Sequence, residues 1–114
     1  RHITTGKAGE TLAVHFLKIK GYSIIAQNWR SGRSEVDIIA FKENVLHLFE
    51  VKTRIGKQPV TPEVSVNHKK MNNLKQAAAA YLYLHPQWKM LQFNIIAITM
   101  NYPVTEIFLI EDVY

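Results

Sequence analysis

The stretch SEVDIIAFKENVLHLFEVKTR, residues 34–54, decides the fold that we expect for this chain. The segments 33–41 and 45–53 are rich in Ile, Val, Leu and Phe, which is typical of β-strands. Glu43 and Asn44 lie between them and predict a tight hairpin turn. Acids and a lysine interrupt runs that otherwise look buried. Because burying an unpaired charge costs several kcal/mol, these charged residues require an explanation.

The register of this hairpin decides where the acids point. A turn of two residues, or of four, places Asp37 opposite Glu50 and Glu35 opposite Lys52. A turn of three residues without a bulge would put the two sets of acids on opposite faces of the sheet. The two-residue and four-residue turns therefore predict that all four charged side chains share one face.

Both faces of the hairpin are mostly apolar, which bears on whether the acids meet solvent. On a solvent-facing side, Glu35 and Lys52 would form a surface ion pair worth less than ~1 kcal/mol. Apolar residues occupy both faces: Ile39, Phe41, Leu46 and Leu48 lie beside the acids, and Val36, Ile38, Ala40, Val45, Phe49 and Val51 lie opposite. A sheet covered on both faces, with a local acidic pocket, favours a functional site over a surface ion pair.

The opposition of Asp37 and Glu50 predicts a metal site. Directly opposed residues have Cβ atoms roughly 4.5–5.5 Å apart, where two carboxylates repel unless a proton or cation lies between them. Oxygen ligands without Cys or clustered His favour Mg²⁺ or Mn²⁺ over Zn²⁺. Lys52 lies two residues beyond Glu50 and can reach a water or an anion held at that metal. Metal-assisted phosphodiester hydrolysis requires this combination.

The elements around the hairpin extend it to an α/β fold. We expect helices over 7–20 and from Asn67 to just before Pro86, and further strands over 22–29, 92–100 and 104–110. Residues 30–32 predict a turn, and 55–65 a loop long enough to suggest a functional role. The order α-β-β-β-α-β-β predicts an antiparallel meander followed by a parallel crossover through the second helix. The expected fold is a single domain, 1–114, with a mixed central sheet flanked by helices.

Length, composition and charge limit the kind of protein. The chain has 114 residues, 47% of them hydrophobic, which is enough for one core. A net charge of +5 favours anionic partners such as nucleic acid. There is no cysteine, so disulfides and thiolate metal sites are excluded. No apolar run approaches the ~20 residues that span a bilayer, and the start does not resemble a signal peptide, so we expect a cytoplasmic protein without a membrane partner.

A wider set of motifs carries a family resemblance. The Asp of the second strand and the Glu-x-Lys of the third resemble the PD-(D/E)XK nuclease superfamily, the fold of many restriction enzymes and of the archaeal Holliday-junction resolvases. The segments GKAGETLAVHFLKIKGYSIIAQNWR, SEVDIIA, FEVKTR and VSVNHKKMNNLKQAAAAYL together resemble the YraN-type family of uncharacterised bacterial proteins. The resemblance covers residues 6–84 well and the last two strands loosely. It implies a restriction-endonuclease-like domain.

The resemblance also implies roles for single residues. Asp37 and Glu50 become the metal-binding carboxylates, with the Val51 backbone carbonyl as a further ligand. Lys52 becomes the group that orients or activates the attacking water. Glu10, on the first turn of the first helix, would reach the metal through water, although an acid near a helix N-terminus is also stabilised by the helix dipole. The remaining matches are Glu35, in the strand of Asp37, and Lys70, early in the second helix.

Other polar positions complete the expected site. The candidate phosphate contacts are Arg30, Arg33, Arg54, Lys57, Lys69 and Lys70. We expect Trp29, at the end of a strand, to pack in the core rather than stack on nucleic acid. Ser34 stands where the family has Gly, and Gln92 and Asn94 stand where a charged Arg and Asp are expected.

The resulting hypothesis is a Mg²⁺- or Mn²⁺-dependent endonuclease that hydrolyses DNA phosphodiester bonds, on branched or damaged DNA. Because a small domain offers limited surface for DNA, a homodimer or a partner protein is also expected. The first alternative is a nucleic-acid-binding or assembly module with a nuclease fold and little catalysis. The second is an interaction domain that binds no nucleic acid.

Overall fold

The computed structural model describes residues 5–56, 68–101 and 103–113. The elements follow one another as α1 (Thr5–Ile19), β1 (Ser23–Ser31), β2 (Ser34–Lys42), β3 (Val45–Ile55), α2 (His68–Leu84), β4 (Leu91–Asn101) and β5 (Val104–Ile110). This order is the predicted one. Asn67 and most of the predicted loop over 55–65 lie outside the described residues, and Ile55 belongs to β3 instead of the loop.

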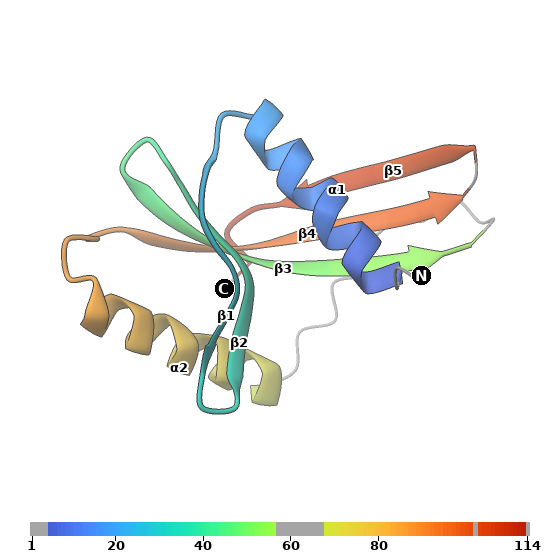
Figure 1. Ribbon diagram of the computed structural model, residues 1–114. Helices are drawn as coiled ribbons and strands as arrows, with labels where there is room; N and C mark the ends of the chain where they lie inside the picture. The colour runs from blue at the N-terminus through green and yellow to red at the C-terminus, as the bar shows by residue number, and fades with distance from the viewer. Residues whose placement is uncertain (1–4, 57–67, 102, 114) are drawn as a thin grey trace.

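One sheet holds the strands in the order β1-β2-β3-β4-β5. Neighbouring strands are antiparallel except β3 and β4, which are parallel and lie on either side of α2 in the chain. The predicted meander, crossover and mixed sheet are therefore confirmed. In Figure 1 the β1–β2 hairpin crosses the strands β3, β4 and β5 steeply, so only part of β2 lies alongside β3.

The turn between β2 and β3 sets the register. Glu43 and Asn44 both have positive φ, 52° and 66°. Two such residues form the hairpin turn that matches the right-handed twist of the flanking strands. Lys42 pairs with Val45, and the ladder continues outward from there. The predicted two-residue turn is confirmed.

The turn between β1 and β2 differs from the prediction over residues 30–32. Strand β1 continues through Ser31, which pairs with Ser34, so Gly32 and Arg33 form the turn. Gly32 has φ 60°, a conformation that glycine adopts without steric cost. The turn therefore consists of Gly32 and Arg33 instead of residues 30–32.

Helix α1 ends in a hydrogen-bonded cap. Gly21 has φ 94°, and its N–H donates to the carbonyl of Lys18 at 3.1 Å. The N–H of Tyr22 donates to the carbonyl of Leu17 at 2.9 Å. These two bonds form the Schellman motif, which satisfies carbonyls at the helix end and turns the chain into β1.

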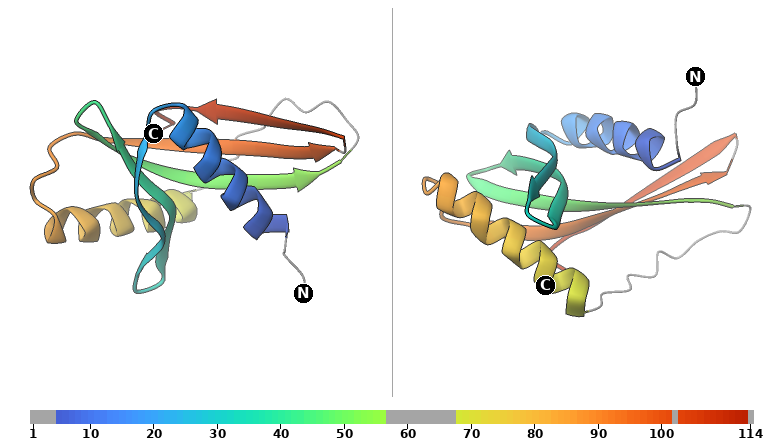
Figure 2. Two further views of the ribbon diagram at one scale, coloured as in Figure 1. Left: turned by 45° about the horizontal axis from the view of Figure 1, so that its top comes forward. Right: turned by 60° about the horizontal axis from the view of Figure 1, so that its bottom comes forward.

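The two helices cover opposite faces of the sheet (Figure 2). Under α1 lies a buried cluster of Ala13, Leu17, Tyr22, Ile38, Ala40, Phe49, Ile96 and Ile98. Under α2 lies a second cluster of Val36, Ile39, Leu46, Leu48, Leu74, Ala77, Ala78 and Tyr81. The prediction that both faces of the hairpin are covered is confirmed. Trp29 packs edge-on against Tyr81 with ring centroids 5.3 Å apart, as expected for a core residue.

One residue breaks the expected alternation. Val36 should share a face with Ile38, but it joins the cluster under α2. On β1, Asn28 lies between Gln27 and Trp29, the partners of Ile38 and Val36, and its φ of 52° is outside the range of a regular strand. The far half of the hairpin therefore turns relative to the rest of the sheet.

Candidate active site where β2 leaves β3

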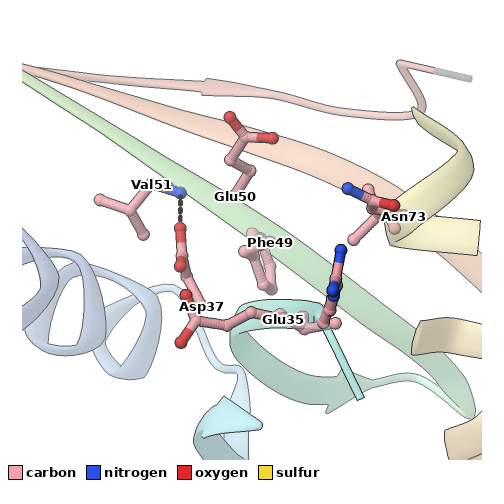
Figure 3. Close-up of a pocket in the computed structure, with 9 residues that line it drawn as sticks. Glu35, Asp37, Phe49, Glu50, Val51 and Asn73 are labelled. Carbon is pink, nitrogen blue, oxygen red and sulfur yellow. Dashed lines mark hydrogen bonds between the residues drawn. The ribbon is translucent and has the colours of Figure 1, made fainter. Parts of the chain in front are cut away.

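The predicted acids lie at the place where β2 and β3 stop pairing. The last pair in the ladder between the two strands is Ile38 with Phe49. Asp37 and Glu50 lie one step further, so the expected direct opposition of these two residues does not belong to the ladder. Instead, the Asp37 Oδ2 accepts a hydrogen bond of 2.8 Å from the N–H of Val51 (Figure 3). The carboxylate takes the place of a backbone partner on β3.

This hydrogen bond also gives the direction of the Val51 carbonyl. In an extended strand the N–H and C=O of one residue point to the same edge. The Val51 N–H points toward Asp37, so its carbonyl faces the same gap between the strands. The Val51 carbonyl therefore lies on the same edge of β3 as the Asp37 carboxylate.

The surroundings of Asp37 make it a poor place for a bare negative charge. Burial raises the pKa of Asp37 to about 6, from 3.8, although the hydrogen bond from Val51 lowers it. Glu10, Glu35 and Glu50 each raise this pKa further by electrostatic repulsion. The fold therefore brings the other three predicted acids within electrostatic range of Asp37. A divalent cation would relieve the repulsion, and carboxylate oxygens suit Mg²⁺ or Mn²⁺.

Glu50 and Lys52 lie together, as predicted from their spacing. The Lys52 Nζ is 3.9 Å from the Glu50 Oε2. In Figure 3 the Glu50 carboxylate extends away from the carboxylate of Asp37. Rotation of the Glu50 side chain is therefore needed for both acids to bind one ion. In this arrangement the described residues contain no group of three or more His, Asp or Glu that could hold a metal ion.

Glu10 reaches the site because α1 packs closely on β3. A Cβ atom at Gly9 would overlap the side chain of Thr53, and its Oγ1 above all. The backbone of α1 therefore rests directly on the side chain of Thr53, which itself lies on the α1 face. Glu10, the next residue, is half-buried and repels Asp37.

The predicted pairing of Glu35 with Lys52 is wrong. The Glu35 carboxylate forms an ion pair of 2.9 Å with Arg30, its partner across the ladder to β1. The reason is that β2 bends away from β3 but remains paired to β1 at this point. Arg30, predicted to contact phosphate, is thus already neutralised by an acid.

The remaining basic candidates are spread over the molecule. Arg33 lines the cavity described next, whereas Arg54 and Lys69 are exposed outside it. Lys57 and the side chain of Lys70 lie outside the described part of the structure. Arg33 is therefore the basic candidate that the structure brings to the acids.

A cavity of about 300 Å³ opens beside Asp37. Residues of β2, β3, α2 and the β1–β2 turn line it: Arg33, Glu35, Val36, Asp37, Phe49, Glu50, Val51, Asn73 and Leu74. Asn73, which Figure 3 shows reaching from α2 toward the site, was not predicted from the sequence. Its position in the chain is that of an ordinary polar helix residue. Only the crossing of α2 over the divergence of β2 and β3 distinguishes it.

A five-stranded mixed sheet with a helix on each face, and with Asp37 and a Glu-x-Lys sequence where two strands part, defines a restriction-endonuclease-like domain of the PD-(D/E)XK class. The chain belongs to the family described as "Uncharacterised protein family UPF0102", which matches residues 9–98. The resemblance to the YraN-type family is thereby confirmed. Among the described residues, no helix is long and apolar enough to cross a membrane.

The match to individual relatives extends over most of the length of each relative. A UPF0102 protein of Koribacter versatilis is 35% identical over 99% of this chain and 80% of its own. One of Thermodesulfovibrio yellowstonii is 40% identical over 84% of this chain and 86% of its own. One of Bacteroides thetaiotaomicron is 42% identical over 85% of this chain and 80% of its own. The match therefore covers 80–86% of the length of each of these relatives.

Proposed function

We propose that this protein is a Mg²⁺- or Mn²⁺-dependent endonuclease that hydrolyses phosphodiester bonds of DNA. The observation that carries the proposal is the environment of Asp37. Its carboxylate is partly buried, fixed by the Val51 N–H, and surrounded by three further acids beside a cavity. Perturbed acids in a cleft are typical of functional sites, and this cluster supplies the oxygen ligands of a divalent cation.

Asp37, Glu50 and the carbonyl of Val51 would hold the ion, with Glu10 further out on α1. The bound cation would supply Lewis acidity, lowering the pKa of a coordinated water and offsetting negative charge on the phosphate. Asp37 would keep its orientation through the hydrogen bond to Val51. The site thus has one fixed carboxylate and one, Glu50, that must rotate to meet it.

Lys52 would act on the water and phosphate side of the site. Its ammonium group lies 3.9 Å from the Glu50 Oε2, beside the proposed ion site. A lysine there can orient the attacking water and stabilise charge that develops on the phosphate.

DNA would approach the side of the cavity that carries Arg33. The net charge of +5 supports an anionic partner, and Arg54 and Lys69 offer additional exposed positive charge. We extend the proposal to branched or damaged DNA as the substrate. We also propose that the protein acts as a homodimer or with a partner protein, in the cytoplasm. Two copies would place two sites for cutting two strands.

The second candidate is a nucleic-acid-binding or assembly module that cleaves little. The observation in its favour is the side-chain arrangement at Glu50, which points away from Asp37 and lies beside Lys52. In that arrangement Lys52 balances the charge of Glu50, as a cation otherwise would. Such a protein would keep the acidic cluster without a complete ion site.

Cleavage of plasmid, single-stranded and four-way-junction DNA with Mn²⁺ tests the proposal. We expect cleavage by the wild type and a loss of at least about a hundredfold in Asp37→Ala, Glu50→Ala and Lys52→Ala. Glu106→Ala, which changes an exposed acid on β5 outside the site, is the control. Equal nicking by all variants would indicate contamination and defeat the enzyme proposal. Salt-sensitive binding that survives the substitutions, without cleavage, would favour the binding module.

A further inference from the structure

The cavity beside Asp37 has two chemically different sides. Glu35, Asp37 and Glu50 form an acidic side on β2 and β3. Arg33 from the β1–β2 turn and Asn73 from α2 supply hydrogen-bond donors elsewhere on its lining. Phosphate hydrolysis at the acids uses neither Arg33 nor Asn73 as a metal ligand. These two residues are therefore available to bind another part of a substrate.

The cavity lining also includes apolar residues. Val36, Phe49 and Leu74 are 1%, 0% and 7% exposed, and all three line the cavity. Such a surface can take the flat face of an aromatic ring but offers it no hydrogen bonds. The Asn73 amide, half-buried, carries both a donor and an acceptor, which is the pattern needed to pair with the polar edge of a nucleobase.

The size of the cavity limits its occupant. A volume of about 300 Å³ is at the lower end of the roughly 300–1,000 Å³ of ligand pockets. It suits one nucleotide and is too small for a base pair with both of its backbones. A nucleotide within a duplex would have to leave the stack to enter, at a cost of a few kcal/mol that an unpaired nucleotide does not incur.

We propose that this cavity binds one unpaired nucleotide next to the phosphate at the acids. Arg33 would contact its phosphate, Asn73 would hydrogen-bond the edge of its base, and the base would lie against Val36 and Leu74. The inference rests on the proposed nuclease function for the position of the reacting phosphate. It adds a substrate class, strands with an unpaired nucleotide, and a positioning residue, Asn73, on α2.

The chain offers a matched control for Asn73. Asn72 is the preceding residue of α2 and is exposed, and it does not line the cavity. Substitution of either asparagine by alanine changes the same chemical groups and helix propensity. A difference between the two variants therefore reports on the cavity and not on the helix.

The test is binding, measured by fluorescence anisotropy with Mg²⁺ present. Asp37→Asn serves as the background, because it removes a charge that repels phosphate and is expected to prevent cleavage. The probes are a labelled single strand, a duplex with one bulged nucleotide, the same duplex with an abasic residue at the bulge, and a fully paired duplex. Asn73→Ala should weaken binding of the single strand and the bulged duplex about tenfold, as expected for one lost polar contact.

The controls should separate the base from the backbone. Asn72→Ala should bind every probe within about twofold of the background protein. Asn73→Asp, which keeps the shape of the side chain, should weaken single-strand binding more than Asn73→Ala does, because its charge repels phosphate. The fully paired duplex and the duplex with the abasic bulge should be nearly insensitive to Asn73→Ala.

Several results would overturn the inference. These are an equal effect of Asn72→Ala and Asn73→Ala, an equal loss on paired and unpaired probes, or no binding of the single strand at all. The failure of the nuclease proposal would look different. Binding that depends on Asn73, in a wild type that never cleaves, would refute the nuclease and retain the cavity. Cleavage by the wild type, together with binding that does not depend on Asn73, would support the nuclease and refute the role of the cavity.

Discussion

The Asp37 carboxylate accepts a hydrogen bond of 2.8 Å from the backbone N–H of Val51, where β2 stops pairing with β3. Beyond the last ladder pair, the Asp37 side chain therefore accepts a hydrogen bond from an N–H of β3 that no longer pairs with the β2 backbone. The same bond fixes a carboxylate among Glu10, Glu35 and Glu50, which raise its pKa together with burial. Asp37 therefore serves both the local backbone structure and the chemistry of the site. The hydrogen bond from Val51 favours its carboxylate, whereas burial and the neighbouring acids disfavour it.

Asp37→Asn should stabilise the metal-free protein at alkaline pH. The pKa of Asp37 is about 6 in the folded state against 3.8 for an ordinary aspartate, so folding takes up a proton between these values. Stability contributed by the protonated form is lost as the pH rises through about 6. Asparagine accepts the bond from Val51 without a charge, so we expect a gain of about 1–2 kcal/mol at pH 8.

Urea denaturation with EDTA at pH 5 and pH 8 measures this gain. The difference between variant and wild type should shrink at pH 5, where Asp37 is largely protonated. Asp112→Asn is the matched control and should show no such dependence, since Asp112 is exposed and away from the acids. A variant less stable than the wild type at pH 8 would show that the charge of Asp37 is well compensated by the fold.

Mn²⁺ should raise the melting temperature of the wild type at pH 8. A ligand that binds only the folded state stabilises it, and this ion would also relieve the repulsion at Asp37. Near pH 5 the ion must displace a proton from Asp37, so the increase should be smaller. Thermal unfolding, followed with and without Mn²⁺ at both pH values, measures the effect.

The same experiment on variants identifies the ligands. Asp37→Asn and Glu50→Gln should lose most of the increase, and Asp112→Asn should keep it. If all the proteins gain equally, the ion binds elsewhere and the proposed site is wrong. If Glu50→Gln alone keeps the full gain, Glu50 remains beside Lys52 and does not rotate toward Asp37.

Gly9→Ala should destabilise the protein although alanine favours helices. The new methyl group would overlap the side chain of Thr53 on β3. Overpacking costs roughly 1–3 kcal/mol, against a gain of roughly 1 kcal/mol in helix propensity. We expect a net loss of about 1 kcal/mol in urea denaturation, and lower cleavage activity because α1 carries Glu10.

Gly6 is the control for this substitution, because a Cβ there meets nothing within 4 Å. Gly6→Ala should leave stability unchanged or raise it slightly. Thr53→Ala should recover part of the loss in the Gly9→Ala protein, because it removes Oγ1 and Cγ2 but leaves Cβ. Equal stability of the Gly6→Ala and Gly9→Ala proteins would mean that α1 moves away from β3 without cost.

The sequence predicts the sheet because the relevant signals are local. Glu43 and Asn44 tolerate positive φ, so the turn and the parity of the hairpin follow from them. Apolar runs on both faces predict two covering layers, and the long link between β3 and β4 predicts the crossover. The turn at Gly32 was misplaced because several polar residues there are equally suited to a turn.

The site is less predictable because it depends on where strands separate. Counting outward along the hairpin assumes that the ladder continues, but it ends at Ile38. Beyond that point β2 follows β1, so Glu35 meets Arg30, and Asp37 meets a backbone N–H. No local pattern marks the bend, since it reflects how β1, β2 and α2 pack together. The position of Asn73 in the site also depends on this packing, so the sequence does not predict it.

Asn94 has a role that its chemistry alone does not reveal. It is buried, and its Oδ1 accepts a hydrogen bond of 3.0 Å from the N–H of Asp112. Its Nδ2 must therefore donate to the His47 Nδ1, 2.9 Å away. This arrangement places the ring proton of His47 on Nε2. Burial lowers the pKa of His47 below 6.5, so the neutral ring is the stable form.

Asn94→Asp, which introduces the acid that the family resemblance leads one to expect, should reverse this preference. A carboxylate beside Nδ1 favours the protonated imidazole, so the pKa of His47 should rise. In the wild type, stability supplied by neutral His47 is present above pH 6.5 and lost as the pH falls, because the unfolded chain then binds the proton. In the variant that loss should be reduced.

Nitrogen NMR of the imidazole at pH 6.5 should show neutral His47 in the wild type and Asn72→Asp, and imidazolium in Asn94→Asp. A wild-type ring already protonated at pH 6.5 would contradict the assigned tautomer.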